Sequence, residues 1–174
     1  MLKGDITVNA ITGSTGAGVK PGATTHFSWR NNNLSIYKPF NAPAPSGNTP
    51  VAEAIAEQLR CRYYVHPLPR DFARGIFATT IIKTKVELPE IVKMYEDYYA
   101  EDSFVHIVEK SIDLKQVVNT NKCLIHCEKY GNKLLITSCI DNLLKGAVGQ
   151  AVQNMNIMFR VEESLGLRLK PSAF

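Results

Sequence analysis

A β-hairpin in the second half of the chain is the feature that most constrains the fold. Residues 123–129 and 133–139 are each predicted to form a short strand, with Tyr130, Gly131 and Asn132 as the turn between them. So short a connection requires antiparallel pairing, because parallel strands need a crossover of a dozen or more residues. The sequence therefore predicts an antiparallel sheet.

Further strands and helices surround this hairpin in the sequence. Clusters of strands broken by two or three helices predict an α+β fold, with a mostly antiparallel sheet and helices on one face. The other predicted strands are 4–12, 34–40, 62–68, 76–86, 105–108 and 116–118. Residues 41–50 form a proline-rich connector, and the predicted helices begin at Thr49 and cover 89–99 and 145–165.

Length and composition limit the classes of function. A chain of 174 residues, 45% hydrophobic and 21% charged, predicts one folded domain over residues 1–174. The net charge of +4 is too small and too evenly spread to predict nucleic-acid binding. The absence of a long apolar run predicts no membrane association, and the absence of a secretory signal predicts a cytoplasmic protein.

The four cysteines predict neither a metal site nor a redox motif. Cys61, Cys123, Cys127 and Cys139 contain no CxxC pair. On a strand, Cys123 and Cys127 face one side and His126 faces the other, which separates the histidine from the thiols. We therefore expect buried structural cysteines beside a surface histidine, and no metal.

The segment ITGSTGAGVK (residues 11–20) resembles a phosphate-binding loop in composition but not in spacing. Gly13 and Gly18 have the separation of a Walker loop, but Val19 occupies the position of the essential lysine. A dinucleotide fingerprint requires glycine where Pro21 stands. Two interpretations remain, a plain turn or a loop that binds an anion or an acyl group through its amides.

Two other segments carry polar groups at the ends of predicted strands. His66 and Arg74 flank a proline-rich passage, which is either an anion-binding site or a stiff loop with solvated arginines. Residues 141–150 run from a strand end into the first turn of a helix that is rich in small residues. Gly146 and Gly149 cost about 1 kcal/mol each relative to alanine in a helix, so a close approach must offset them.

These three segments resemble one enzyme family. DNLLKGAVGQAVQNMN (141–156), GSTGAG (13–18) and HPLPRDFARGI (66–76) are similar to the C-terminal half of the N-acetyl-gamma-glutamyl-phosphate reductases, in the semialdehyde-dehydrogenase group. The resemblance implies a fold like the C-terminal domain of glyceraldehyde-3-phosphate dehydrogenase. It also implies a homodimer, and a separate Rossmann domain that holds NADP, in the same chain or in another.

The resemblance assigns roles to residues of this chain. It implies that the glycine loop lines the substrate pocket and that an arginine grips the anion, while a later strand end approaches the cofactor. The substrate-binding candidates are Thr15, Gly16, Ala17, Lys20, His66 and Arg74, and the cofactor-binding candidates are Asn142 and Gly146. The helix 145–165 is implied to pack on the Rossmann domain.

The catalytic groups of the family are missing from this chain. The Asn-Pro-Gly-Cys segment with the nucleophile is absent, and residues 41–45 read NAPAP where the family carries its histidines. We therefore name no catalytic residue, and we do not expect this chain alone to be active or to bind NADP tightly. One hypothesis is the substrate-binding and dimerisation part of the reductase in arginine biosynthesis, and the other is a catalytically silent binding or self-associating module.

The helix 145–165 also predicts a contact surface. Its apolar stripe lacks a partner in the sequence at hand, so it should either fold onto the sheet or drive association. The stripe consists of Val148, Ala151, Val152, Met155 and Met158 or Phe159.

Overall fold

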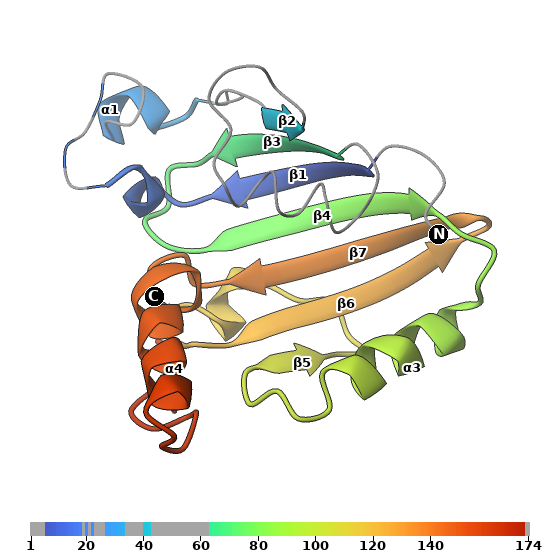
Figure 1. The fold of residues 1–174 in the computed structure, drawn as a ribbon. Helices are drawn as coiled ribbons and strands as arrows, with labels where there is room; N and C mark the ends of the chain where they lie inside the picture. The colour runs from blue at the N-terminus through green and yellow to red at the C-terminus, as the bar shows by residue number, and fades with distance from the viewer. Residues whose placement is uncertain are drawn as a thin grey trace.

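The computed structural model describes residues 6–18, 20, 22, 27–33, 40–42 and 63–172, and these form a seven-stranded sheet with three α-helices (Figure 1). The strand order is β2-β3-β1-β4-β7-β6-β5. The strands are β1 Ile6–Thr12, β2 Phe40–Ala42, β3 Tyr63–Pro69, β4 Ile76–Lys83, β5 Val105–Ile107, β6 Cys123–Tyr130 and β7 Lys133–Ile140. The helices are α1 Phe27–Arg30, α3 Leu88–Tyr98 and α4 Gly149–Met158.

The predicted hairpin is confirmed and forms the centre of one half of the sheet. β6 and β7 are antiparallel, with Tyr130 opposite Lys133 across the turn. The pairs β1–β4, β2–β3 and β4–β7 are antiparallel as well, whereas β1–β3 and β5–β6 are parallel. The expected α+β fold with a mostly antiparallel sheet is therefore correct.

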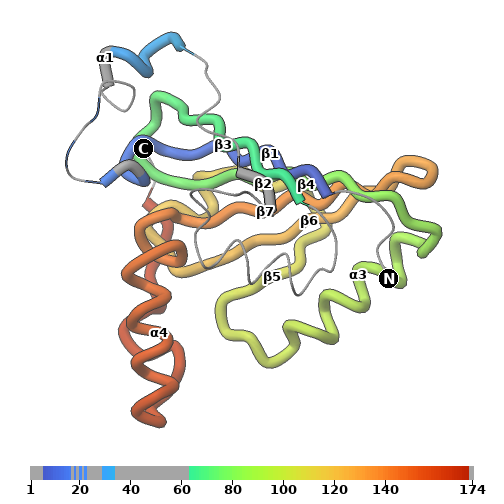
Figure 2. The backbone as a smooth tube through the Cα atoms, turned by 45° about the horizontal axis from the view of Figure 1, so that its top comes forward, coloured from blue at the N-terminus to red at the C-terminus, as the bar shows by residue number. Residues whose placement is uncertain are grey.

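The helices occupy two different places around the sheet. Ile91 of α3 packs against Ile125 and Leu134, so α3 covers one face of the sheet near β6 and β7. α4 stands beyond the strand ends, and Figure 2 shows it projecting away from the sheet. Its apolar stripe does not fold onto the sheet, which leaves association as the remaining expectation.

Three predicted elements are wrong in extent or type. The helix predicted to reach residue 165 consists of a π-helical turn, Leu144–Val148, followed by α4, which ends at Met158 because Arg160 adopts a φ of 56°. The strand predicted at 116–118 is a 3-10 turn, Leu114–Gln116, that the Asp113 side chain caps. Between the predicted strands 4–12 and 34–40, where the sequence predicted no helix, the chain contains the short helix α1 and a 3-10 turn, Ser14–Ala17.

The expected surface position of His126 is also wrong. The histidine does face away from Cys123 and Cys127, but its side chain is buried and its Nδ1 lies 2.9 Å from the Val108 carbonyl oxygen. Cys127 and Cys139 are buried, as expected, whereas Cys123 is half-buried. Burial raises the pKa of Cys123 and Cys127 and raises the pKa of Cys139 to about 12. Thiols with raised pKa are poor nucleophiles at neutral pH.

Some expectations fall outside the described residues. These are Cys61, Val19, the connector beyond Ala42, the helix predicted from Thr49, and residues 34–39 of the second predicted strand.

Candidate functional site

The glycine loop and the passage before β4 are held together by their backbones. Gly13 N–H donates to the Gly75 carbonyl at 2.8 Å, and Thr15 N–H donates to the Ala73 carbonyl at 3.1 Å. A Cβ on Gly13 would lie 2.5 Å from the Ala73 carbonyl oxygen, so only glycine permits this approach. The first glycine of the loop is therefore explained by packing.

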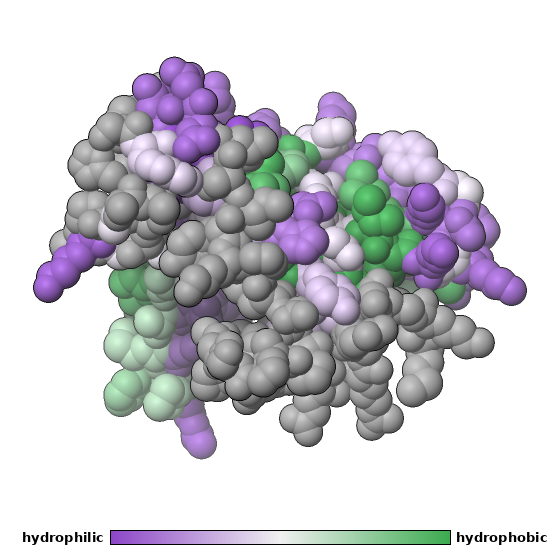
Figure 3. Space-filling view, turned by 90° about the horizontal axis from the view of Figure 1, so that it is seen from above, coloured by the Kyte–Doolittle hydropathy of each residue, from purple (hydrophilic) through white to green (hydrophobic). Residues whose placement is uncertain are grey.

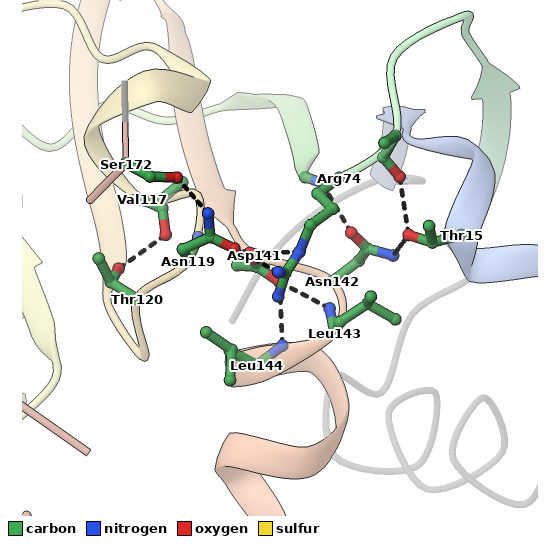
Figure 4. A network of polar contacts seen from close by, with 12 residues as sticks. Thr15, Arg74, Val117, Asn119, Thr120, Asp141, Asn142, Leu143, Leu144 and Ser172 are labelled. Carbon is green, nitrogen blue, oxygen red and sulfur yellow. Dashed lines mark hydrogen bonds and ion pairs between the residues drawn. The ribbon is translucent and has the colours of Figure 1, made fainter. Parts of the chain in front are cut away.

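Asn142 ties a third segment to these two (Figure 4). Its Oδ1 accepts from Gly75 N–H at 2.7 Å, and its Nδ2 donates to Thr15 Oγ1 at 2.9 Å. Thr15 Oγ1 in turn donates to the Ala73 carbonyl at 2.7 Å. One buried amide side chain thus fixes the three motifs that carried the family resemblance relative to one another.

Asp141 organises the start of the segment after β7. Its side chain is completely buried and accepts from the N–H groups of Leu143 at 2.8 Å and Leu144 at 2.9 Å. Its second oxygen accepts from Asn119 N–H at 2.7 Å. A carboxylate that accepts backbone hydrogen bonds in this way satisfies donors at the start of the π-helical turn, as a cap does.

Arg74 supplies the positive charge that balances Asp141. Its Nε lies 3.0 Å from one Asp141 carboxylate oxygen, and a terminal nitrogen donates to the other at 3.1 Å. The second terminal nitrogen donates to Asn119 Oδ1, and Asn119 Nδ2 donates to Ser172 Oγ. About a quarter of the Arg74 side chain, 26%, stays exposed.

The two glycines of the helix start have different surroundings. A Cβ on Gly149 would lie 2.2 Å from Asn121 Oδ1 and 2.8 Å from the Leu144 carbonyl oxygen. A Cβ on Gly146 would meet its first neighbour at 3.4 Å, an ordinary contact. The close approach of other atoms that the sequence predicted for these glycines therefore exists at Gly149 but not at Gly146.

We predict opposite effects of alanine at these two positions. Gly149→Ala should lower the free energy of unfolding by about 1–3 kcal/mol because the buried Asn121 and the Leu144 carbonyl must move. Gly146→Ala, the matched control, should be neutral or stabilising by up to about 1 kcal/mol, since it removes the helix cost of glycine. Urea unfolding of both variants measures the difference, and equal losses would contradict the close-packing account.

α4 buries polar residues and exposes apolar ones. Gly149, Gln153 and Asn156 are buried, and Asn156 Nδ2 donates to the carbonyls of Glu163 and Leu165, both at 3.0 Å. The exposed large side chains on α4 and just after it are Met155, Ile157, Met158 and Phe159. Figure 3 shows this hydrophobic surface at the lower left. Such a helix face indicates a partner.

The structure brings together some of the predicted site residues and separates others. Thr15, Arg74 and Asn142 belong to one set of hydrogen-bonded segments, and Gly146 N–H donates to the Asp141 carbonyl at 3.0 Å beside them. Gly16 and Ala17 continue the 3-10 turn of Thr15, and Lys20 is exposed. His66 lies in the middle of β3, where its Nδ1 is 3.3 Å from Asn9 Oδ1.

Two residues of the site carried no role in the sequence interpretation. Asp141 stood in the quoted DNLLKG segment, where an acid just before a helix start is a recognisable capping signal. Asn119 carried no such signal, because its contact with Arg74 spans 45 positions of the sequence. Only the fold brings it to the site.

Within the part of the chain that the structure describes, two kinds of feature are absent. No group of three or more His, Cys, Asp or Glu residues is arranged to hold a metal ion. Among these same residues, no helix combines the length and the apolar character that a membrane crossing requires.

Known proteins resemble this chain in sequence and in fold. A family model described as "Semialdehyde dehydrogenase, dimerisation domain" matches residues 1–142. The chain is 67% identical over its full length to the N-acetyl-gamma-glutamyl-phosphate reductases of Phocaeicola vulgatus and Bacteroides thetaiotaomicron, and it spans 54% of each. It is 58% identical to the enzyme of the same name from Parabacteroides distasonis, again over 54% of that protein.

Solved structures agree on the fold. A probable aspartate-semialdehyde dehydrogenase from Pseudomonas aeruginosa superposes with a TM-score of 0.62 at 10% identity, over 90% of this chain and 55% of that one. Aspartate semialdehyde dehydrogenase II from Vibrio cholerae gives 0.59 at 11% identity, with the same coverage. At such low identity, these likenesses support the architecture alone.

Proposed function

Because the chain belongs to the semialdehyde dehydrogenase dimerisation-domain family, we propose that it is the substrate-binding and dimerisation part of an N-acetyl-gamma-glutamyl-phosphate reductase. The observation that carries the proposal is the convergence of the three resembling segments on Asn142. Relatives 67% identical to this chain bear that name, and the chain covers about half of their length, 54%. The reaction belongs to cytoplasmic arginine biosynthesis.

In this proposal Arg74 binds the anionic part of the substrate. Each terminal nitrogen of its guanidinium uses one of two N–H groups, one toward Asp141 and one toward Asn119, while the buried Nε faces Asp141 at 3.0 Å. Two N–H groups remain on a side chain that is 26% exposed. A guanidinium held by a carboxylate behind it can offer these groups to a substrate carboxylate or phosphate.

The glycine loop would form the neighbouring wall of the substrate pocket. Thr15 is held in place by Asn142 and Ala73, and the next residue, Gly16, is exposed with room around its Cα. A rigid turn with exposed backbone suits close approach to an acyl group. Lys20 remains a candidate at the edge of this pocket, whereas His66 lies in the middle of β3, apart from the loop.

NADP would be held mainly by a dinucleotide-binding domain outside this chain. The Oδ1 of Asn142 already accepts from Gly75, one of its amide hydrogens goes to Thr15, and Gly146 N–H is bonded to Asp141. Asn142 keeps one amide hydrogen and Gly146 lacks a side chain, so both fit an edge contact with a cofactor but not its phosphates. When bound, the cofactor supplies the hydride.

The apolar face of α4 would pack on that dinucleotide-binding domain. The buried Asn156 side chain of α4 already donates hydrogen bonds to carbonyls of this chain. Met155, Met158 and Phe159 are exposed to solvent. Burying about three such side chains favours docking by several kcal/mol. This contact would place Asn142 and Gly146 near the cofactor.

A catalytically silent module is the second candidate. Residues 41–45 read NAPAP in place of the family's histidines, so the chain lacks the acid–base group of that mechanism. The module would keep the scaffold and bind substrate or a partner without turnover.

An activity assay with a supplied partner domain separates the two candidates. We would mix the chain with the dinucleotide-binding half of the Bacteroides thetaiotaomicron relative and follow NADPH oxidation with N-acetyl-gamma-glutamyl phosphate. The chain alone should be inactive. The mixture should oxidise NADPH faster than the partner half alone. Its rate should stay about a hundredfold or more below that of the full-length relative, because the histidine is missing.

A matched variant tests the role of Arg74 in the same assay. Arg74→Lys should raise KM for the acyl phosphate about tenfold or more, because a lysine cannot keep both the Asp141 and the substrate contacts. A mixture no faster than the partner half alone would support the silent module. Activity of the unmixed chain would overturn the dependence on a second domain.

A further inference from the structure

We propose that Asn119 is a positioning residue, which fixes the Arg74 guanidinium so that its free N–H groups meet the anionic part of the substrate. The inference rests on the proposed function, in which Arg74 binds that anion. Asp141 holds the guanidinium at Nε and at one terminal nitrogen, Nη2. The other terminal nitrogen, Nη1, donates to Asn119 Oδ1 and has no second partner among the described residues.

The hydrogen-bond partners of Asn119 determine which way its side-chain amide points (Figure 4). A guanidinium can only donate, so the amide oxygen must face Arg74. The amide nitrogen then faces the end of the chain, where Nδ2 donates to Ser172 Oγ. Both ends of the amide are therefore engaged, and a rotation of this side chain would break two hydrogen bonds.

The backbone of Asn119 binds the other member of the ion pair. Its N–H group donates to Asp141 Oδ2 at 2.7 Å. The residue adopts a φ of 63°, in the left-handed region, where asparagine is more frequent than most residues that carry a side chain. One residue thus contacts Asp141 through its backbone and Arg74 through its side chain.

Buried residues on both sides of Asn119 make it a fixed point. Its neighbours in the chain, Val118 and Thr120, are 0% and 1% exposed. Thr120 Oγ1 donates to the Val117 carbonyl at 2.7 Å, which closes the turn that carries Asn119. A polar group supported by packing and hydrogen bonds holds its partner more precisely than one without such support.

Asn119 decides which N–H groups of Arg74 are left for a ligand. It takes one N–H group of Nη1, and Asp141 takes one of Nη2, so each terminal nitrogen keeps one. The two oxygens of a carboxylate or phosphate can accept from one N–H group on each of these nitrogens. Without the Asn119 side chain, Arg74 is held from the Asp141 side alone, and its free N–H groups lose their fixed direction.

NMR of the labelled arginine side chains, with N-acetyl-glutamate as the ligand, tests this role. Asn119→Gly removes the amide, and glycine adopts the left-handed φ without strain, so the circular dichroism spectrum should be unchanged. The dissociation constant should rise about tenfold, because a hydrogen bond that orients a charged group is lost. The terminal N–H resonances of Arg74, separate in the unmodified chain, should merge in this variant because the nitrogens rotate more freely.

Two further variants make the test specific. Asn32→Gly is the matched control, because Asn32 also has a positive φ, 53°, and is exposed; the dissociation constant and the Arg74 resonances should both stay unchanged. Arg74→Lys identifies the Arg74 resonances by their loss, and it should weaken binding at least as much as Asn119→Gly.

The outcomes separate this inference from the proposed function. Separate Arg74 resonances in Asn119→Gly, or an unchanged dissociation constant in a series where Arg74→Lys weakens binding, would overturn the positioning role. Equal binding by the unmodified chain and Arg74→Lys, or no binding by either, would overturn the proposed substrate contact of Arg74. In that case merged resonances in Asn119→Gly would still support Asn119 as the residue that positions the guanidinium.

Discussion

Replacing Asp141 with alanine is expected to lower the free energy of unfolding by about 3–5 kcal/mol. The variant loses a completely buried carboxylate that accepts from Leu143, Leu144 and Asn119. It also leaves the Arg74 guanidinium without its counter-charge, and an unpaired charge in a mostly buried place is costly. Urea unfolding followed by circular dichroism measures the loss.

Two comparisons make this result specific to the buried pair. Asp97→Ala removes an exposed carboxylate that pairs with Lys93 one helical turn away, and it should cost less than about 0.5 kcal/mol. The double variant Asp141→Ala with Arg74→Ala should be less destabilised than the sum of the two single variants. A loss below about 1 kcal/mol for Asp141→Ala would contradict the organising role of this side chain.

Gly13→Ala is expected to destabilise the fold by about 3 kcal/mol or more, the upper end for overpacking. The added Cβ would lie 2.5 Å from the Ala73 carbonyl oxygen and 2.8 Å from the Arg74 amide nitrogen. Both neighbours are backbone atoms of a passage held by the Gly13–Gly75 and Thr15–Ala73 hydrogen bonds, so neither can move alone. Thermal unfolding of the variant provides the measurement.

Gly16→Ala is the matched control within the same loop. A Cβ there would meet Thr12 Oγ1 at 3.5 Å, an ordinary contact, so the substitution should change the free energy of unfolding by less than about 0.5 kcal/mol. If both variants unfold at the same temperature, close backbone approach is not the reason for glycine at position 13.

The local sequence pattern was sufficient to predict the helices and strands that have strong periodicity and clear ends. The β6–β7 hairpin and α3 were predicted within about two residues, because their turn and their Pro89 start are encoded locally. The last helix was predicted seven residues too long, because no local pattern marks the positive φ of Arg160 that ends it. Residues 116–118 looked like a strand because two valines were counted without the Asp113 cap before them.

Burial was harder to predict than secondary structure. The alternation along β6 correctly separated His126 from Cys123 and Cys127, but it could not show that Val108 covers the histidine. Nor could helical periodicity show that α4 buries Gln153 and Asn156 and exposes its methionines. These outcomes depend on which chain segments lie nearby, and a local pattern does not contain that information.

The sequence by itself determined the α+β class, the central hairpin, the glycine at the helix start and the likeness to a family. Those properties depend on neighbouring residues, whose spacing sets periodicity, turns and motifs. Only the tertiary structure decided that Asn142 joins the three motifs and that Asp141 and Asn119 hold Arg74. Such contacts join positions many residues apart, and strand register, which places them, is set by the packing of the whole sheet.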